Sequence, residues 1–163
     1  MTVFATPEPT WTAMVAALDE DPSDEAWALK LTVQCRDHLR HTLTRAETPG
    51  VSVSAWNRDP GTKSPQRAEG PGKSWRTAKD TAGGPNGPSG TFLRWHVLLG
   101  ALIAKEFEDA GREAPAWTRK LGALDKEWVL PTKVMSENQV RHNAPDWLAQ
   151  RGIYISKADL ALV

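Results

Sequence analysis

Residues 91–111, TFLRWHVLLGALIAKEFEDAG, decide the fold. At about 100° per residue, the large apolar side chains of this stretch occupy most of the circumference of a helix. The polar exceptions form one narrow strip: Arg94, Lys105, Glu108 and Asp109. A helix that is apolar nearly all round is covered on nearly every side by other elements. We therefore predict that this helix, capped by Thr91 and ending near Gly111, is the central one of the domain.

A second long helix is predicted upstream, ending at about Arg45. Asp21 is a good N-cap residue, Pro22 suits the first helical position, and acidic residues follow in the first turn. Its apolar face is formed by Trp27, Leu31, Cys35, Leu39 and Leu43. We interpret the acidic start and basic end of this region as the charge order that the helix dipole favours.

Shorter helices are expected over residues 10–18 and 116–124, and between Pro145 and Gly152. The fold class is therefore mainly α: a bundle-like single domain over residues 1–163, with a loop insertion, residues 46–90, between the two longest helices. One small two-stranded β element is expected at most, in which residues 153–155 pair with residues 51–54.

Composition narrows the function classes. The formal net charge is zero, and a dedicated duplex-DNA binder usually has a strong basic excess. The single Cys excludes an internal disulfide framework. The longest apolar run, residues 97–104, is far shorter than the ~20 residues that cross a bilayer. We expect a cytoplasmic protein with no membrane contact and no cofactor.

The insertion at residues 46–90 contains many Gly and Pro residues and little that predicts regular structure. Its segment GPGKS, residues 70–74, resembles the end of a phosphate-binding loop, but Arg67 stands where that motif requires glycine. The insertion also interleaves two tryptophans with six basic residues: Trp56, Arg58, Lys63, Arg67, Lys73, Trp75, Arg76 and Lys79. This composition suits a protein partner or single-stranded nucleic acid. Alternatively, both tryptophans fold back onto the helices as a lid.

The other tryptophans are explained by packing. Trp11, Trp27 and Trp95 fall at helical core positions, whereas Trp117, Trp128 and Trp147 stand near the ends of short elements. We expect the first group in the core and the second between the core and the C-terminal part.

The spacing Arg36-x4-His41 resembles that of the HEPN family of helical ribonucleases. The resemblance covers six residues and implies RNA cleavage at a dimer interface, with Arg36 and His41 as the catalytic pair. On a regular helix the two side chains point in different directions, so a shared site would need a second chain or a distorted turn. The alternative is a solvated basic helix end.

Polar side chains also fall on helix faces that should be buried: Cys35, His38, His96 and Glu106. If these residues converge, Cys35, His38 and His96 suit a transition-metal site. The histidines and Glu106 also suit an acid–base cluster. The alternative is a core histidine hydrogen-bonded to a carboxylate or a carbonyl group.

We predict an interaction protein, either an accessory subunit or an antitoxin-like binder, that engages a protein partner or a larger assembly through the Trp- and Arg-bearing loop. The alternative is a protein that binds or cleaves RNA or single-stranded nucleic acid, with Arg36 and His41 or the His38 and His96 cluster as catalytic residues.

Overall fold

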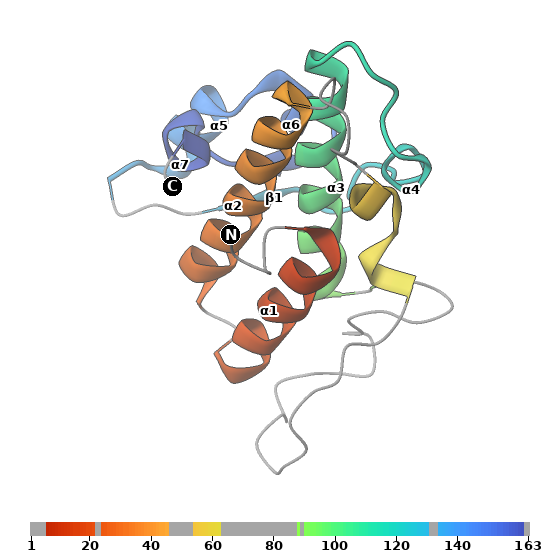
Figure 1. The fold of residues 1–163 in the computed structure, drawn as a ribbon. Helices are drawn as coiled ribbons and strands as arrows, with labels where there is room; N and C mark the ends of the chain where they lie inside the picture. The colour runs from red at the N-terminus through yellow and green to blue at the C-terminus, as the bar shows by residue number, and fades with distance from the viewer. Residues whose placement is uncertain are drawn as a thin grey trace.

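The computed structural model describes residues 6–21, 24–45, 54–62, 88, 90–130 and 134–161. This part of the chain is mainly helical with one small sheet, as predicted (Figure 1). Its elements are α1 (Pro7–Glu20), α2 (Glu25–Thr44), the 3-10 turns η2 (Ser54–Asn57) and η3 (Pro60–Thr62), α3 (Thr91–Asp109), α4 (Ala116–Arg119), β1 (Trp128–Val129), α5 (Glu137–Asn143), α6 (Asp146–Ala149), β2 (Ile153–Tyr154) and α7 (Lys157–Ala161).

Helices α1 and α2 form an antiparallel pair at the N-terminal side of the molecule (Figure 1). The predicted cap of α2 was wrong by one turn. Asp24, not Asp21, is the N-cap, and its side chain accepts a hydrogen bond from the backbone N–H of Trp27 at 3.3 Å. Asp21 instead ends α1, because that helix continues two residues beyond the predicted limit of Leu18.

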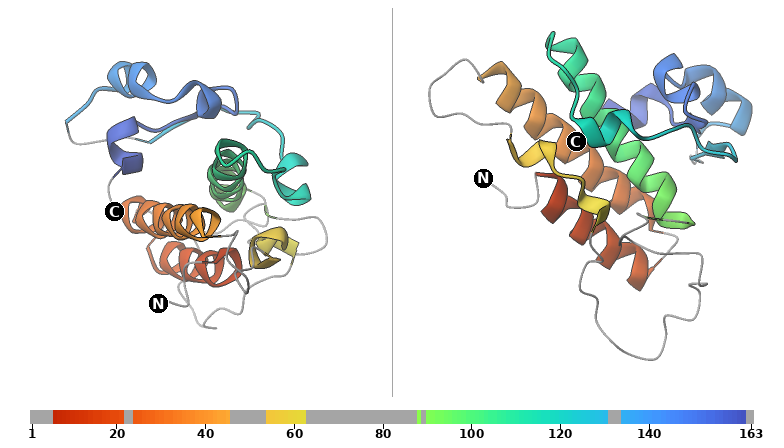
Figure 2. Two further views of the ribbon diagram at one scale, coloured as in Figure 1. Left: turned by 45° about the horizontal axis from the view of Figure 1, so that its top comes forward. Right: turned by 90° about the vertical axis from the view of Figure 1, so that its right-hand side faces the viewer.

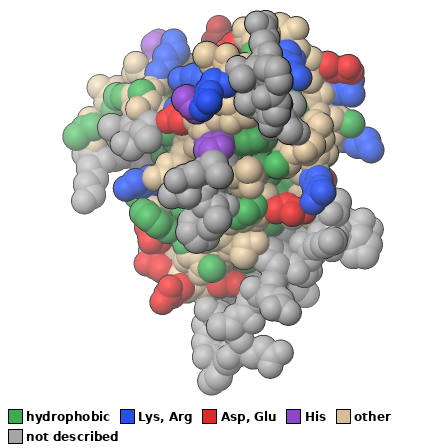
Figure 3. Space-filling view, viewed as in Figure 1, with side chains coloured by type: hydrophobic (Ala, Val, Ile, Leu, Met, Phe, Trp, Pro, Cys, Tyr) green, Lys and Arg blue, Asp and Glu red, His purple; other side chains and the backbone are tan. Residues whose placement is uncertain are grey.

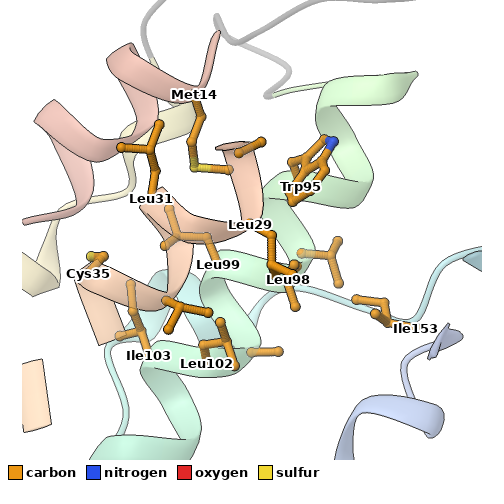
Figure 4. Close-up of a cluster of buried hydrophobic side chains, with 14 of the residues drawn as sticks. Met14, Leu29, Leu31, Cys35, Trp95, Leu98, Leu99, Leu102, Ile103 and Ile153 are labelled. Carbon is orange, nitrogen blue, oxygen red and sulfur yellow. The ribbon is translucent and has the colours of Figure 1, made fainter. Parts of the chain in front are cut away.

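Helix α3 is the central helix, as predicted. Its buried residues follow one another without a break from Trp95 to Ala104, and its side chains interdigitate with those of α2 in the core (Figure 4). Gly90, with φ 62°, stands at the N-cap, so Thr91 is the first helical residue rather than the cap.

Helices α2 and α3 run in the same direction, side by side (Figures 1 and 2). An ion pair joins them near their first residues, where Arg94 lies 3.9 Å from Glu25. Another joins them near their last turns, where Arg40 lies 2.6 Å from Glu106. Because each helix is about 30 Å long, the connection between them must travel back along their length.

The turns η2 and η3 lie on that return path and contact α1. Gly61 in η3 also lies against Pro88, since a Cβ on Gly61 would be 2.6 Å from the Pro88 ring. The chain therefore passes residue 62 and returns at residue 88 in almost the same place.

The C-terminal elements, β1 to α7, cover the side of α2 and α3 that faces away from α1 (Figure 2). Strands β1 and β2 pair in parallel, with Trp128 opposite Ile153. The predicted strand at residues 153–155 thus exists over Ile153–Tyr154, and its partner in the described chain is β1. The predicted partner was the segment 51–54. Residues 51–53 lie outside the described residues, and Ser54 begins η2. Ser136 and Gln139 form a capping box at the start of α5, a signal that predicts this helix and was missed.

Among the described residues, no helix is both long enough and apolar enough to cross a membrane.

Candidate functional site

The four polar residues predicted on buried helix faces, Cys35, His38, His96 and Glu106, do not form one cluster, and His38 is only partly buried. Glu106 is held by Arg40, whose Nε and Nη2 donate hydrogen bonds of 3.0 and 2.6 Å to its two carboxylate oxygens. This bond raises the pKa of Arg40. His96 is bound instead by Asp59. Within the described ranges, no group of three or more His, Cys, Asp or Glu residues is placed to hold a metal ion.

The buried His96 pairs with Asp59, whose side chain is partly exposed. The Nε2 atom of His96 lies 2.8 Å from Oδ1 of Asp59, which also accepts a hydrogen bond of 2.8 Å from the backbone N–H of Gly61. Burial alone would raise the pKa of Asp59, but these two hydrogen bonds, together with electrostatic attraction to His96 and Lys120, outweigh it and the pKa is lowered. The carboxylate is therefore ionised at neutral pH and joins η3 to α3. This pair matches one of the alternatives expected from the sequence, a core histidine hydrogen-bonded to a carboxylate.

Two tryptophan rings pack against His96. The His96 ring stacks on Trp117 at a centroid distance of 5.5 Å, and the edge of Trp11 meets it at the same distance. Trp117 donates its indole N–H to the backbone carbonyl of Trp56 at 2.8 Å. These contacts attach the short segment 54–62 to α1, α3 and α4, and we name this segment the clasp.

Trp56 is the central side chain of the clasp, with an exposed fraction of 2%. Its ring stacks on His38 at 5.6 Å. Trp56 thus packs as the lid alternative describes, while Arg58 beside it is exposed. The other predicted partner-binding residues lie outside the described residues: Lys63, Arg67, Lys73, Trp75, Arg76 and Lys79.

Cys35 and His38 have environments that suppress their charged forms. Burial raises the pKa of the Cys35 thiol to about 12, so that it remains neutral and poorly nucleophilic at neutral pH. Burial, followed by repulsion from His41, lowers the pKa of His38.

Arg36 and His41 are not brought into one site within the chain. Arg36 is almost fully buried, and its Nε and Nη2 donate to Oδ1 of Asp37 at 3.0 and 2.8 Å. His41 is exposed. The predicted ribonuclease pair would therefore need the buried guanidinium to leave its carboxylate partner.

A surface hollow lies between the end of α1 and the start of α2. It encloses about 510 Å³ and is lined by Ala13, Ala16, Ala17, Glu20, Asp21, Asp24 and Trp27. We name it the Trp27 groove. Trp27, predicted to be in the core, has an exposed fraction of 45%. Viewed down the axis of α2, the buried side chains occupy an arc that begins at Leu31 and ends at Val33. Trp27 lies just outside this arc, next to Leu31.

One wall of the Trp27 groove consists of small side chains, and one end of the groove is acidic. Ala13, Ala16 and Ala17 follow the i, i+3, i+4 spacing of one helix face, a signal that the sequence contained and that predicts a close approach. Acidic side chains gather where α1 passes into α2, at the lower left in Figure 3. Lys30 lies over the ring of Trp27, with Nζ 5.4 Å from the ring centroid.

No protein family, curated protein or solved structure matches this chain.

Proposed function

We propose that this chain is a non-enzymatic interaction protein that binds another protein at the Trp27 groove. The observation that carries the proposal is the large exposed indole at the rim of a hollow with an alanine wall. Tryptophan is enriched among the residues that dominate the energy of protein interfaces, where it fills or borders a pocket in the partner's surface. Burial of this exposed ring against a partner would therefore be favourable.

We further propose that the loop insertion, residues 46–90, supplies a second contact with the same partner. Its residues Lys63, Arg67, Lys73, Trp75, Arg76 and Lys79 interleave aromatic and cationic side chains, a composition that is also typical of interface anchors. The exposed Arg58 belongs to the same group. This second contact predicts that the double change Trp75→Ala and Arg76→Ala weakens partner association and leaves the helical circular dichroism signal unchanged.

The test is affinity purification from the native cell with wild-type chain, with Trp27→Ala and with the control Val134→Ala. Val134 is 85% exposed and is not part of the groove, so its truncation removes an exposed apolar side chain elsewhere. We expect one protein that co-purifies with the wild-type and Val134→Ala chains and is lost with Trp27→Ala. Its binding is then measured with both purified proteins by calorimetry.

Trp27→Ala should weaken that binding by at least about 2 kcal/mol if Trp27 dominates the interface. Equal affinity of the wild-type and Trp27→Ala chains for the purified partner would contradict the proposal. Salt-dependent binding of a labelled single-stranded oligonucleotide, in place of a protein, would favour the nucleic-acid alternative.

A further inference from the structure

We propose that the occupant of the Trp27 groove is a basic segment of the partner protein, with Lys or Arg side chains that enter the groove. This inference rests on the proposed function and specifies the chemistry of the partner. Three features of the groove support it: the charge at its end, the cation already bound by its aromatic ring, and the small residues of its wall.

The charge of the groove is mainly negative. Glu20, Asp21 and Asp24 line it, and Glu20 and Asp21 are exposed. Glu20 and Asp21 lie at the C-terminal end of α1, where the helix dipole is itself negative and favours cations. The last turn of α1 contains no basic residue. These acidic residues therefore add to the negative potential of the helix end, and a cationic ligand would relieve it.

The ring of Trp27 is a surface that attracts cations. Lys30 of the same helix already lies over it at 5.4 Å from the centroid, within the range of a cation–π interaction. Because Trp27 is 45% exposed, part of its side chain is open to solvent beside the carboxylates. A partner guanidinium can thus meet an aromatic ring and carboxylates in the same hollow.

The alanine wall suits the aliphatic part of a long basic side chain. Ala13 and Ala17 are partly buried and Ala16 is exposed, so their methyl groups form a shallow apolar surface. Lys and Arg side chains characteristically place their methylene stems on such surfaces and keep the charged group in a polar environment. The apolar wall and the acidic end therefore match the two parts of one side chain.

A second surface hollow among the described residues lacks these features. It encloses about 490 Å³ between the ends of α2 and α3 and is lined by Arg40, Leu43, Thr44, Glu106, Asp109 and Ala110. There Arg40 pairs with Glu106, Asp109 pairs with Lys105 at 3.1 Å, and the described lining residues include no aromatic ring. Charge complementarity thus distinguishes the Trp27 groove.

The test uses a fluorescein-labelled peptide of about 15 residues, built from Lys, Arg, Ala and Leu in the helical pattern of one basic and one apolar face. Its twin has Glu in place of every Lys and Arg. Fluorescence anisotropy with the full chain should show the basic peptide binding at least tenfold more tightly than the acidic twin. Raising the salt from about 50 to 200 mM should weaken that binding, because exposed charge pairs are screened.

Matched charge variants locate the binding. The groove variant carries Glu20→Gln, Asp21→Asn and Asp24→Asn, and asparagine at position 24 can still cap α2. The control variant, with the same loss of charge, carries Glu108→Gln, Glu113→Gln and Asp125→Asn, three exposed positions outside the groove. We expect the groove variant to bind the basic peptide about tenfold more weakly, as for three surface pairs lost together. The control should bind within about twofold of the wild-type chain, as remote exposed charges are screened.

Trp27→Ala should reduce peptide binding by about thirtyfold, and Trp27→Phe should restore part of it, since phenylalanine keeps a ring that attracts cations. Circular dichroism confirms that each variant is folded.

Equal binding of the two peptides, or equal losses in the groove and control variants, would overturn the inference. Self-association of the chain that Trp27→Ala abolishes, without peptide binding, would overturn it too and identify a second copy as the occupant. If an identified protein partner needs Trp27 but binds the groove charge variant normally, the basic chemistry is wrong and the proposed function stands. If that partner binds Trp27→Ala normally, the proposed function itself fails.

Discussion

The clasp and the Trp27 groove each present one tryptophan, and the two have opposite environments. In the clasp, Trp56 is 2% exposed, stacks on His38 and receives at its backbone carbonyl the indole N–H of Trp117. In the groove, Trp27 is 45% exposed and its ring has Lys30 over one face. The first tryptophan joins elements of the fold, whereas the second lies at an edge that the fold leaves open.

The difference arises from which segment covers each residue. Trp56 belongs to a Gly/Pro-rich connection, yet that connection returns between α1 and α3 and brings its tryptophan into the core. Trp27 belongs to a regular helix, yet the wall of α1 that faces it consists of alanines too short to cover it. The local sequence therefore does not determine whether either tryptophan is exposed. The element that packs next to it does.

The largest effect should follow from Trp56→Ala. Removing a fully buried indole costs about 3 to 5 kcal/mol of unfolding free energy, because both apolar contacts and packing are lost. Urea denaturation followed by far-UV circular dichroism measures this loss for Trp56→Ala and Trp27→Ala in parallel. Equal losses in the two variants would remove the contrast between clasp and groove.

A smaller loss is expected for Asp59→Asn, which keeps the shape of the side chain and removes its charge. The bond of an ionised carboxylate to His96 and Gly61 should contribute about 1.5 to 3 kcal/mol at pH 7. Because the pKa of Asp59 is lowered from 3.8, this contribution is complete above that pH and is lost as the pH falls below it. The difference between wild-type and Asp59→Asn should therefore be constant from pH 7 down to about 4 and shrink as the pH is lowered further towards 3.

The matched control for this measurement is Asp125→Asn, since Asp125 is exposed. Its effect should be small at both pH values. A difference for Asp59→Asn that stays constant with pH would contradict the assignment of the charged bond to the stability of the clasp.

Replacing residues 63–87 by a short glycine linker should preserve the fold, because the flanking residues Gly61 and Pro88 already lie together. Shortening a loop of ~25 residues to about 4 should raise the unfolding free energy by about 1.5 kcal/mol through the entropy of loop closure. Thermal denaturation measures the change. A loss of helical signal would contradict it, and unchanged binding to an identified partner would exclude the loop as a second contact.

The smallest change in stability is expected for Trp27→Ala, at about 1 kcal/mol or less, as for an exposed position outside the core. The same variant should show the largest loss of partner binding. A stability loss as large as that of Trp56→Ala would indicate that Trp27 is a core residue and would weaken the case for the groove.

The sequence was sufficient for the framework. The continuous apolar character of residues 91–111 predicted α3 as the central helix. The predicted apolar face of α2, from Trp27 to Leu43, is buried at Leu31, Cys35 and Leu39, whereas Trp27 is exposed and Leu43 is only partly buried. The packing of α2 against α3 was also predicted, but the parallel direction of the two helices and the carboxylate that binds His96 could not be predicted in this way. Asp59 stands in a Pro/Gly turn 37 residues before His96, and no periodicity connects two such positions.

The Trp27 groove was predictable only in part. The three alanines on one face of α1 were visible, and so was the acidic run that follows them. Their interpretation as helix-start charges was wrong for Glu20 and Asp21, because α1 extends to Glu20 and places both residues at a helix C-terminus. The predicted end of α1 was two residues too early, and this error led to the wrong interpretation of these acidic residues.

The parallel arrangement of α2 and α3 has a consequence for synthesis of the chain. Helices α1 and α2 can pair as soon as both have left the ribosome, but the apolar face that α2 offers to α3 stays uncovered until residue 109 has been added. At the usual elongation rates, the interval from residue 45 to residue 109 is about 3 to 13 s. During that time the nascent chain presents an unprotected apolar helix face, which is the kind of surface that chaperones recognise.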